Sequence, residues 1–514
     1  MLWIDYVLFA LYALSLVGIA LYTRGRSKSV DDFLHAGKRG LGGWMTAFAY
    51  GTTYFSAVIF IGYAGNFGRQ YGLASVWIGI GNAILGSLIA WAVLAKRTKN
   101  MTMRLASKTM PDFFAKRYGS SRLKIVSAII IFVLLTPYSA SVYNGLSALF
   151  ERVYGIPGWV MMVLLATLTA LYLFFGGYFA TALSDFIQGI VMLVGVCLMV
   201  FCFLNHENVS WDLSSIVSDP EHTWFTFGSE NHGLYGNTVS LLSLIFLTSF
   251  GVWALPQTVH KYYAIRDKRA INRGMVVSTV FALVIGFGAY FTGALSSLFP
   301  EVGAVAGDRV IPEMLSLVIP SGLMGIIAIL ILSASMSTLS SVSLASASVV
   351  AVDLYKGALR PDAEDKKVNL LMRLLCLGFI VLSVVIAVLN EEYKITAIAY
   401  LMGISWGTLA GCFMGPYVLG LVWRRVSRAA VWASIGTSLG LTVALILFFG
   451  YDKLGYACTL GEALKAGVGC SPMIGVICMI ASLIVTATVT LFTKAPEEEL
   501  LTRAFDSPLE NEIK

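Results

Sequence analysis

Five hydroxyl side chains lie within eight residues of an otherwise apolar run, in the segment ASMSTLSS at 334–341. On a helix, residues three or four apart share a face, so Ser337 lies beside Ser340 and Ser341, and beside Ala334 one turn earlier. Such hydroxyls bond back to their own helix, join neighbouring helices or coordinate something that moves. Neutral hydroxyl and carbonyl oxygens would suit a monovalent alkali cation, since Ca²⁺ and Mg²⁺ normally require carboxylates and transition metals prefer nitrogen or sulfur.

A single carboxylate is the second chemical feature, at Asp185 in the segment GGYFATALSDFIQG at 176–189. A carboxylate inside an apolar span is costly and is by default a functional hypothesis. Asp185 is expected about one turn from the inner boundary, so contact with water is an alternative explanation. Gln188, one turn further, would share its face, and an ion route leading inward would use such a pair.

Other chemistry is not indicated. The chain has five His and seven Cys, with no CxxC pair and no metal-ligand spacing. Cys458 and Cys470 would share an outer loop, where a disulfide and two free thiols both remain open. A membrane-embedded enzyme would gather His, Asp and Glu at one depth, so we expect no enzyme.

The composition is that of an integral membrane protein. Of 514 residues, 57% are hydrophobic and 13% charged, and the mean hydropathy is +0.78, far above a water-soluble chain. The net charge of +7 is explained by basic residues in loops on the inner side of the membrane and does not indicate a nucleic-acid partner. We expect a lipid bilayer and a small solute as partners.

Apolar windows of about 20 residues predict thirteen membrane spans. Their approximate limits are 2–22, 44–68, 74–95, 122–151, 157–175, 181–204, 237–260, 273–299, 316–352, 369–389, 395–422, 429–450 and 471–493.

The loop charges predict the orientation of these spans. With the N-terminus outside, 30 of the 36 Lys and Arg fall in inner loops or the tail, and the longest outer loop, 205–236, has none. Basic residues favour the cytoplasmic side, so we expect a multi-pass protein of the plasma (inner) membrane with a cytoplasmic C-terminus. The first span carries Asp5 and lacks a basic leader and a small-residue cleavage site, so we interpret it as a retained helix. One transmembrane domain, 1–493, and a short cytoplasmic tail, 494–514, account for the chain.

Two spans carry helix-loosening residues at mid-depth: GTTYFSA at 51–57 and TSFGVWALP at 248–256. They are five spans apart. Interrupted helices at matching positions in two five-helix halves are typical of an inverted-repeat transporter with its site at the bilayer midplane. Gly and Pro are also common in membrane helices for packing alone, and the spacing leaves both explanations open.

Three segments together resemble the sodium/solute symporter family, whose proteins are solute-carrier-5-like. The segment at 176–189 resembles that family's sixth-helix signature, and 334–341 followed by Asp353-Leu354-Tyr355 resembles its ninth-helix signature. PDFFAKRYG at 111–119 fits its second inner loop. The matches fall in the right order on the right spans, as in a bacterial-type member.

The resemblance implies a LeuT-like core of two five-helix inverted repeats, spans two to eleven at about 44–422, with one extra helix before and two after. It implies Na⁺-driven import of a small solute by alternating access, with Na⁺ as the only cofactor. The family's common Na⁺ site corresponds by position to Thr52, Phe55, Ala334, Ser337 and Thr338. Some members hold a second Na⁺, which here corresponds to Asp185, Ser337, Ser340 and Ser341; coupling to one Na⁺ is the alternative.

The solute is less determined by the sequence. The family's proline carriers have an acidic residue where this chain has Tyr54, and the residue set of its sugar carriers is not found here. We expect an amino acid or organic acid rather than a sugar, although no buried Arg or Lys is evident to pair a carboxylate. Proton-coupled or uncoupled transport by the same fold is the alternative, and we expect a functional monomer. Candidate pocket residues are Tyr54, Ser56, Tyr138, Asn144, Trp253 and Gln257.

Overall fold

The computed structural model describes residues 3–27, 29–35, 41–217, 237–393 and 398–508. Over these ranges the chain is helical, apart from one isolated bridge between Leu41 and Ile265. Within these described ranges, eleven helical runs are long and apolar enough to cross a membrane. They are α1 (Trp3–Thr23), Val58–Leu105, α8 (Ser121–Tyr154), α9 (Gly158–Leu204), Asn237–Ala254, Lys268–Leu298, Met324–Leu359, α16 (Asp365–Tyr393), Ile398–Val422, α19 (Arg428–Leu454) and α21 (Ser471–Phe492). The prediction of an all-helical membrane protein is confirmed.

Several runs are composites of α, 3₁₀ and π segments. Their parts are η1 (Val58–Tyr63), α4 (Ala64–Tyr71), η2 (Gly72–Ser75), α5 (Val76–Gly81), η3 (Asn82–Ile89), η4 (Trp91–Ala95), α6 (Lys96–Leu105), α11 (Asn237–Gly251), η5 (Val252–Ala254), α13 (Lys268–Ala294), η6 (Leu295–Leu298), α15 (Met324–Ser348), η8 (Val349–Leu359), α17 (Ile398–Met414), η9 (Gly415–Leu419) and α18 (Gly420–Val422). The shorter helices are α2 (Val30–His35), α3 (Gly43–Tyr54), α7 (Met110–Tyr118), α10 (Ser214–Val217), α12 (Pro256–Ala264), η7 (Pro300–Val302), α14 (Gly307–Val318), α20 (Leu460–Val468), α22 (Glu498–Leu501) and η10 (Thr502–Asp506).

Two of the eleven runs are much longer than a bilayer is thick. Val58–Leu105 has 48 residues and α9 has 47, which as straight helices would each measure about 70 Å. Each contains a glycine with positive φ, Gly72 at 53° and Gly177 at 58°. Because residues with a Cβ rarely adopt that conformation, glycine is required at both bends.

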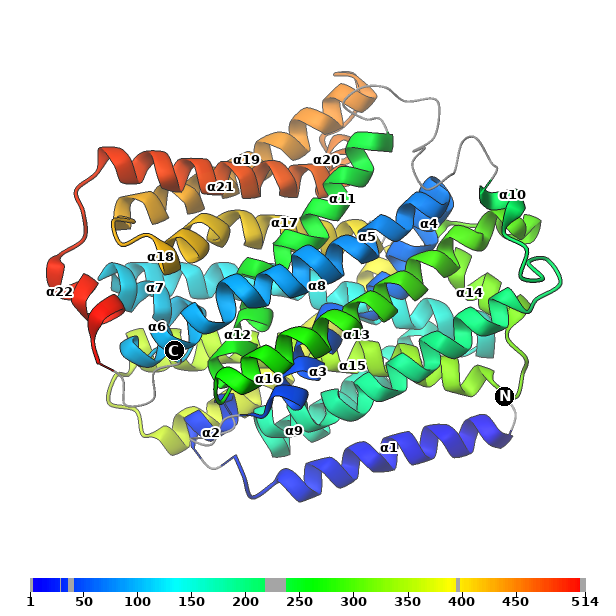
Figure 1. The fold of residues 1–514 in the computed structure, drawn as a ribbon, viewed down its shortest axis with the longest axis horizontal. Helices are drawn as coiled ribbons and strands as arrows, with labels where there is room; N and C mark the ends of the chain where they lie inside the picture. Colours follow the sequence, from blue (N-terminus) through cyan, green and yellow to red (C-terminus); the bar gives the residue numbers. More distant parts are fainter. Residues whose placement is uncertain (1–2, 28, 36–40, 218–236, 394–397, 509–514) are drawn as a thin grey trace.

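The helix that carries the hydroxyl cluster, α15, lies at the centre of the molecule. Every residue of α15 except Ile326 is buried, and the helix packs against α8, α9 and α3. Figure 1 shows α1 along one edge of the bundle and α19 with α21 along the opposite edge, with α15 between them. The polar residues of α15 are thus enclosed by protein on all sides.

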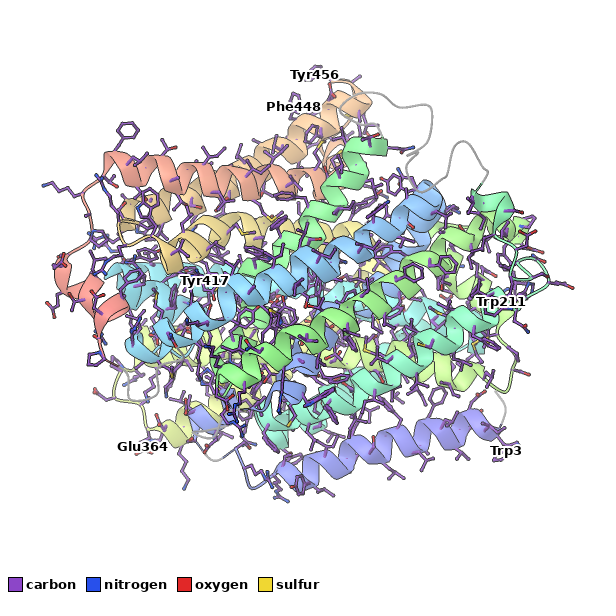
Figure 2. All side chains as sticks on the ribbon, viewed as in Figure 1. Trp3, Trp211, Glu364, Tyr417, Phe448 and Tyr456 are labelled. Atoms are coloured by element: carbon purple, nitrogen blue, oxygen red, sulfur yellow. The ribbon has the colours of Figure 1, made fainter. Side chains whose placement is uncertain are left out.

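The outward-facing side chains of the peripheral helices are apolar. Val443 on α19, Ile484 on α21 and Val381 on α16 are exposed, as expected for helices that face hydrocarbon. Figure 2 shows exposed Trp3 and Trp211 near one end of the bundle and Glu364 near the other. Aromatic side chains at a helix end are typical of the membrane interface.

Two of the motif segments, the one at 111–119 and the one at 353–355, pack against one another. Lys124 contacts the carboxylates of Asp112, at 2.9 Å, and Asp353, at 3.5 Å, and the Thr109 hydroxyl donates to Asp353 at 2.7 Å. Burial raises the pKa of Asp112, but the ammonium groups of Lys124 and Lys116 outweigh it and hold this pKa below its usual value. The second-inner-loop motif and the segment at 353–355 therefore form one structural unit.

Other expectations outside the core have plain outcomes. Cys458 and Cys470 are both free thiols, so the disulfide alternative is not realised. In the tail, η10 packs against α6, and Asp506 accepts hydrogen bonds from Arg424. Residues 218–236 of the expected outer loop, and Lys394, lie outside the described residues.

Candidate cation and solute site

The first interruption falls where the sequence predicts it, in 51–57. Helix α3 ends at Tyr54, Phe55 adopts an extended conformation (φ −100°, ψ 98°), and the chain resumes as η1 at Val58. The Phe55 amide donates to the Gly51 carbonyl at 3.1 Å. The carbonyls of the last turn beyond Gly51 lack helical partners and are available to other groups.

The second interruption falls within 248–256. Helix α11 ends at Gly251 and continues as the 3₁₀ turn η5; Leu255 is extended (φ −81°, ψ 127°), and Pro256 opens α12. Pro is favoured at that position because its missing N–H would have no helical partner. The Tyr54 hydroxyl donates to the Thr248 carbonyl at 2.7 Å, which links the two interruptions directly.

Hydroxyls of α15 meet the freed carbonyls of α3. Ser337 Oγ lies 3.0 Å from the Thr52 carbonyl and 3.2 Å from the Ala334 carbonyl. Thr338 Oγ1 lies 3.4 Å from the carbonyls of both Thr52 and Thr53. These side chains are at most 2% exposed. The structure therefore brings together four of the five residues expected at the first Na⁺ site, and the fifth, Phe55, forms the buried break itself.

The donor set fits an alkali cation. It consists of carbonyl and hydroxyl oxygens, with no carboxylate, thiolate or imidazole among the residues just named, and such hard, neutral ligands suit Na⁺ better than a divalent or transition metal. Two other hydroxyls of the cluster bond within α15 instead: Ser335 Oγ donates to the Ile331 carbonyl at 2.8 Å, and Ser340 Oγ to the Ser337 carbonyl at 3.0 Å. The back-bonding explanation thus holds for those two residues.

Asp185 is completely buried, so the alternative in which it reaches water at the inner boundary is wrong. Its Oδ2 lies 3.6 Å from the Nζ of Lys261 on α12, and the same Nζ donates to Ser341 Oγ at 2.9 Å. Gln188 does not pair with Asp185; its amide donates to the Tyr12 hydroxyl at 3.0 Å. Asp185 and Ser341, both expected at a second Na⁺ site, are joined by an ammonium group.

Lys261 corrects two expectations. The loop charges place it in an inner loop, and no buried Lys or Arg is evident in the sequence to pair a carboxylate of the solute, whereas the structure leaves this side chain only 1% exposed inside the molecule. Helix α12 continues to Ala264, past the predicted limit of the span at 260. The spacing from Gln257 to Lys261 is the i to i+4 spacing of one helix face, and extending the seventh span by a turn would have found it.

Several candidate solute residues form an aromatic and polar cluster beside the cation site. The rings of Tyr54 and Tyr138 lie 6.2 and 5.5 Å from that of Trp406. The Tyr138 hydroxyl lies close to Ser56 and Thr338 but makes no hydrogen bond of standard geometry. A solute held by this cluster would touch the same helices that would hold Na⁺.

The remaining candidates have different surroundings. Trp253 donates its indole N–H to the Leu85 carbonyl at 3.0 Å, and Gln257 is buried with an unpartnered Oε1. The Asn144 amide donates to the Ala387 carbonyl at 2.8 Å and accepts from Asn390 at 3.1 Å. Asn144 thus joins α8 to α16.

Two further residues of this region were missed from the sequence. Asn82 Oδ1 accepts hydrogen bonds from Thr248 at 2.7 Å and Ser249 at 3.2 Å, while its Nδ2 is buried without a partner. The indole N–H of Trp406, on α17, is also buried; it lies close to the Tyr138 hydroxyl but makes no hydrogen bond of standard geometry. Unpaired buried donors are costly and call for an explanation, and a bound solute would supply acceptors. An amide in mid-span at Asn82 was a signal in the sequence for the first of them.

Comparisons with known proteins place this geometry in context. The model of the sodium:solute symporter family matches residues 33–440. The osmoregulated proline transporter OpuE of Bacillus subtilis is 28% identical over 446 residues, covering 85% of this chain and 87% of the relative. The sodium/pantothenate symporter of Haemophilus influenzae is 27% identical over 448 residues, covering 85% and 89%. The solved structure of a Na⁺-coupled sialic acid symporter, in a substrate-bound outward-open state, superposes with a TM-score of 0.75 over 97% of this chain and 99% of its own. The two sequences are 16% identical, so the likeness shows a shared fold.

Proposed function

The chain belongs to the sodium:solute symporter family, and on that premise we propose that it imports an amino acid or a similarly small polar solute together with Na⁺ held between α3 and α15. Use of Na⁺ as the coupling ion follows from the family and its Na⁺-coupled relatives. The observation that supports the site is the convergence of the Ser337 and Thr338 hydroxyls on the Thr52 carbonyl across the break in α3.

The position of the ion explains how its binding would be coupled to that of the solute. A Na⁺ between α3 and α15 favours the conformation in which the two helices lie close, and a solute on the cluster of Tyr54, Tyr138 and Trp406 would bind the same conformation. Each ligand then raises the affinity for the other. One positive charge crossing 100 mV, inside negative, contributes about 2.3 kcal/mol, which suffices for accumulation of an uncharged or zwitterionic solute by well over tenfold.

The buried polar groups support a small, net-neutral solute. Asn82 Nδ2 is a buried donor without a partner, and Asn82 is joined through Thr248 to Tyr54 of the cluster, so a molecule with an acceptor group would satisfy it. The buried cation of this region, Lys261, already has Asp185 as its partner. The relatives named for proline and pantothenate give the first two solutes to test. Tyr54, in place of the acidic residue of the family's proline carriers, leaves proline itself open.

We further propose that the chain crosses the membrane thirteen times, because each of the two long helical runs would cross it twice and each of the other nine runs once. A 47- or 48-residue run with a positive-φ glycine has the length of two bilayer crossings. In Figures 1 and 2, Trp3 lies near one end of the bundle and α22 near the other, as an odd number of crossings requires. With the loop charges, this supports an external N-terminus and a tail from 494 on the cytoplasmic side of the plasma membrane. We also propose that this single transmembrane domain works as a monomer.

A ligand screen tests the proposal. Purified protein is heated with L-proline, pantothenate, other amino acids and sugars, in NaCl and in choline chloride of equal ionic strength, because a ligand stabilises the folded state only if it binds there. We expect stabilisation by an amino acid or organic acid that requires Na⁺. Stabilisation that is independent of Na⁺ and changes with pH would instead support a proton-coupled carrier.

A further inference from the structure

A buried ammonium group occupies the place where a second Na⁺ was expected. Lys261 Nζ donates to Ser341 Oγ at 2.9 Å and lies 3.6 Å from Asp185 Oδ2. It also lies 5.1 Å from the centre of the Tyr178 ring, whose face attracts cations. All four side chains are at most 4% exposed.

The ligands of this ammonium are those a Na⁺ would use. A carboxylate supplies the neutralising charge and a serine hydroxyl supplies a neutral oxygen. With Lys261 in place the pair carries no net charge, so Asp185 has no excess negative charge to attract a second monovalent cation. A Na⁺ on the same carboxylate would lie beside the ammonium in a poorly solvated interior, where like charges repel strongly.

The ammonium is also connected to the first cation site. Ser341 Oγ, which accepts from Lys261, lies 2.9 Å from Thr53 Oγ1, and the Thr53 carbonyl faces Thr338 Oγ1 at 3.4 Å. One short chain of contacts therefore joins α12 and α9 to α3 and α15. A cation at either position holds broken helices against α15, and only the one at the first site is free to leave.

We propose that the Lys261 ammonium is a tethered, non-transported cation in place of a second Na⁺, so that the carrier binds one Na⁺ per cycle. This inference rests on the proposed Na⁺ site between α3 and α15 and adds to it the stoichiometry. The sequence is compatible with one or two Na⁺ ions per transport cycle. Because the Lys261 ammonium is covalently attached and cannot be transported, one Na⁺ remains to be transported.

Counting bound Na⁺ tests this without knowledge of the solute. ²²Na⁺ binding is measured to saturation on the purified full-length chain, with choline chloride to hold the ionic strength. We expect one Na⁺ per wild-type protein and two for Lys261→Ala, because removal of the ammonium leaves Asp185 and Ser341 for the ion. Two Na⁺ on the wild type, or one on a folded Lys261→Ala, would overturn the inference.

A neutralised pair serves as the second variant. Asp185→Asn combined with Lys261→Met removes both charges and leaves no unpaired ion, so it keeps the test decisive if Lys261→Ala fails to fold. We expect it to bind one Na⁺, with an affinity that falls by about one to two orders of magnitude when Ser337→Ala is added. Binding of none by the double variant would place the single Na⁺ at Asp185 and overturn the inference. Absence of Na⁺ binding by the wild type would instead refute the proposed function.

Discussion

Replacing Ser337 by Ala should weaken Na⁺ binding by about one to two orders of magnitude. Ser337 Oγ lies 3.0 Å from the Thr52 carbonyl and 3.2 Å from the Ala334 carbonyl, so a Na⁺ among these oxygens would have the hydroxyl as a direct ligand. A contact between a charged group and a neutral polar one contributes about 1.5–3 kcal/mol, and each 1.4 kcal/mol corresponds to tenfold in affinity. The expected loss is about 10- to 150-fold.

Thermal stabilisation by NaCl measures this loss. A ligand at ten times its Kd stabilises the folded state by about 1.4 kcal/mol, from RT ln(1 + [L]/Kd). At the same NaCl concentration, a variant with 30-fold weaker affinity would gain only about 0.2 kcal/mol. The titration is run against choline chloride, so that the effect of ionic strength cancels.

Ser335→Ala is the matched control. Ser335 lies in the same cluster and is equally buried, but its hydroxyl donates to Ile331 on its own helix at 2.8 Å. It should alter overall stability without altering the dependence on Na⁺. If the two variants shift the NaCl titration equally, or if neither does, Ser337 is not a Na⁺ ligand.

Three further predictions concern stability. Asp185→Asn should destabilise the protein by about 3–5 kcal/mol, because it leaves the Lys261 ammonium buried without its partner. Adding Lys261→Met should recover most of this loss of stability. Equal stability of the single and double variants in detergent-unfolding assays would show that the two charges do not interact. Gly177→Ala should lower the free energy of unfolding by about 1–3 kcal/mol, because φ at Gly177 is 58° and a Cβ there would lie 2.7 Å from Phe33 Cδ2. Gly18→Ala is the control, since a Cβ at Gly18 would have no atom within 4 Å, and it should not destabilise the protein. Similar melting temperatures of the two variants would contradict the requirement for glycine at the bend. The Asp112 ion pairs should stabilise the wild type fully above about pH 4, where an unfolded Asp is ionised, and this contribution should disappear as the pH falls through the lower pKa of Asp112 in the folded state. The stability of Asp112→Asn should therefore depend less on pH in acid-unfolding experiments. An unchanged acid-unfolding profile would refute this source of stability.

The helical membrane architecture and the two interruptions were predictable because both leave local marks. Apolar windows give spans, and runs such as 51–57 and 248–256 combine residues that weaken a helix. The family and its use of Na⁺ followed from segments whose residues are consecutive in the chain, and the comparisons confirm them. The individual Na⁺ and solute ligands remain predictions, now with a geometry that can be tested.

What the sequence did not reveal depends on contacts between distant segments. Lys261 looks like a loop residue in a hydropathy window, because the carboxylate that neutralises it lies on another helix. The hydrogen bond between Asn144 and Asn390 joins residues that are equally remote in the sequence. The number of predicted spans exceeds the number of continuous helical runs because the helical runs bend at Gly72 and Gly177 without ending there.

Uptake into proteoliposomes tests the central claim most directly. The vesicles receive radiolabelled L-proline, or the solute with the largest Na⁺-dependent stabilisation in the screen, at 100 mV inside negative with either Na⁺ or choline on both sides. One Na⁺ per zwitterion predicts accumulation that approaches about 50-fold in Na⁺, from about 2.3 kcal/mol per charge, and none in choline, with Ser337→Ala requiring much more Na⁺. Accumulation in choline driven by a proton gradient alone would contradict the account.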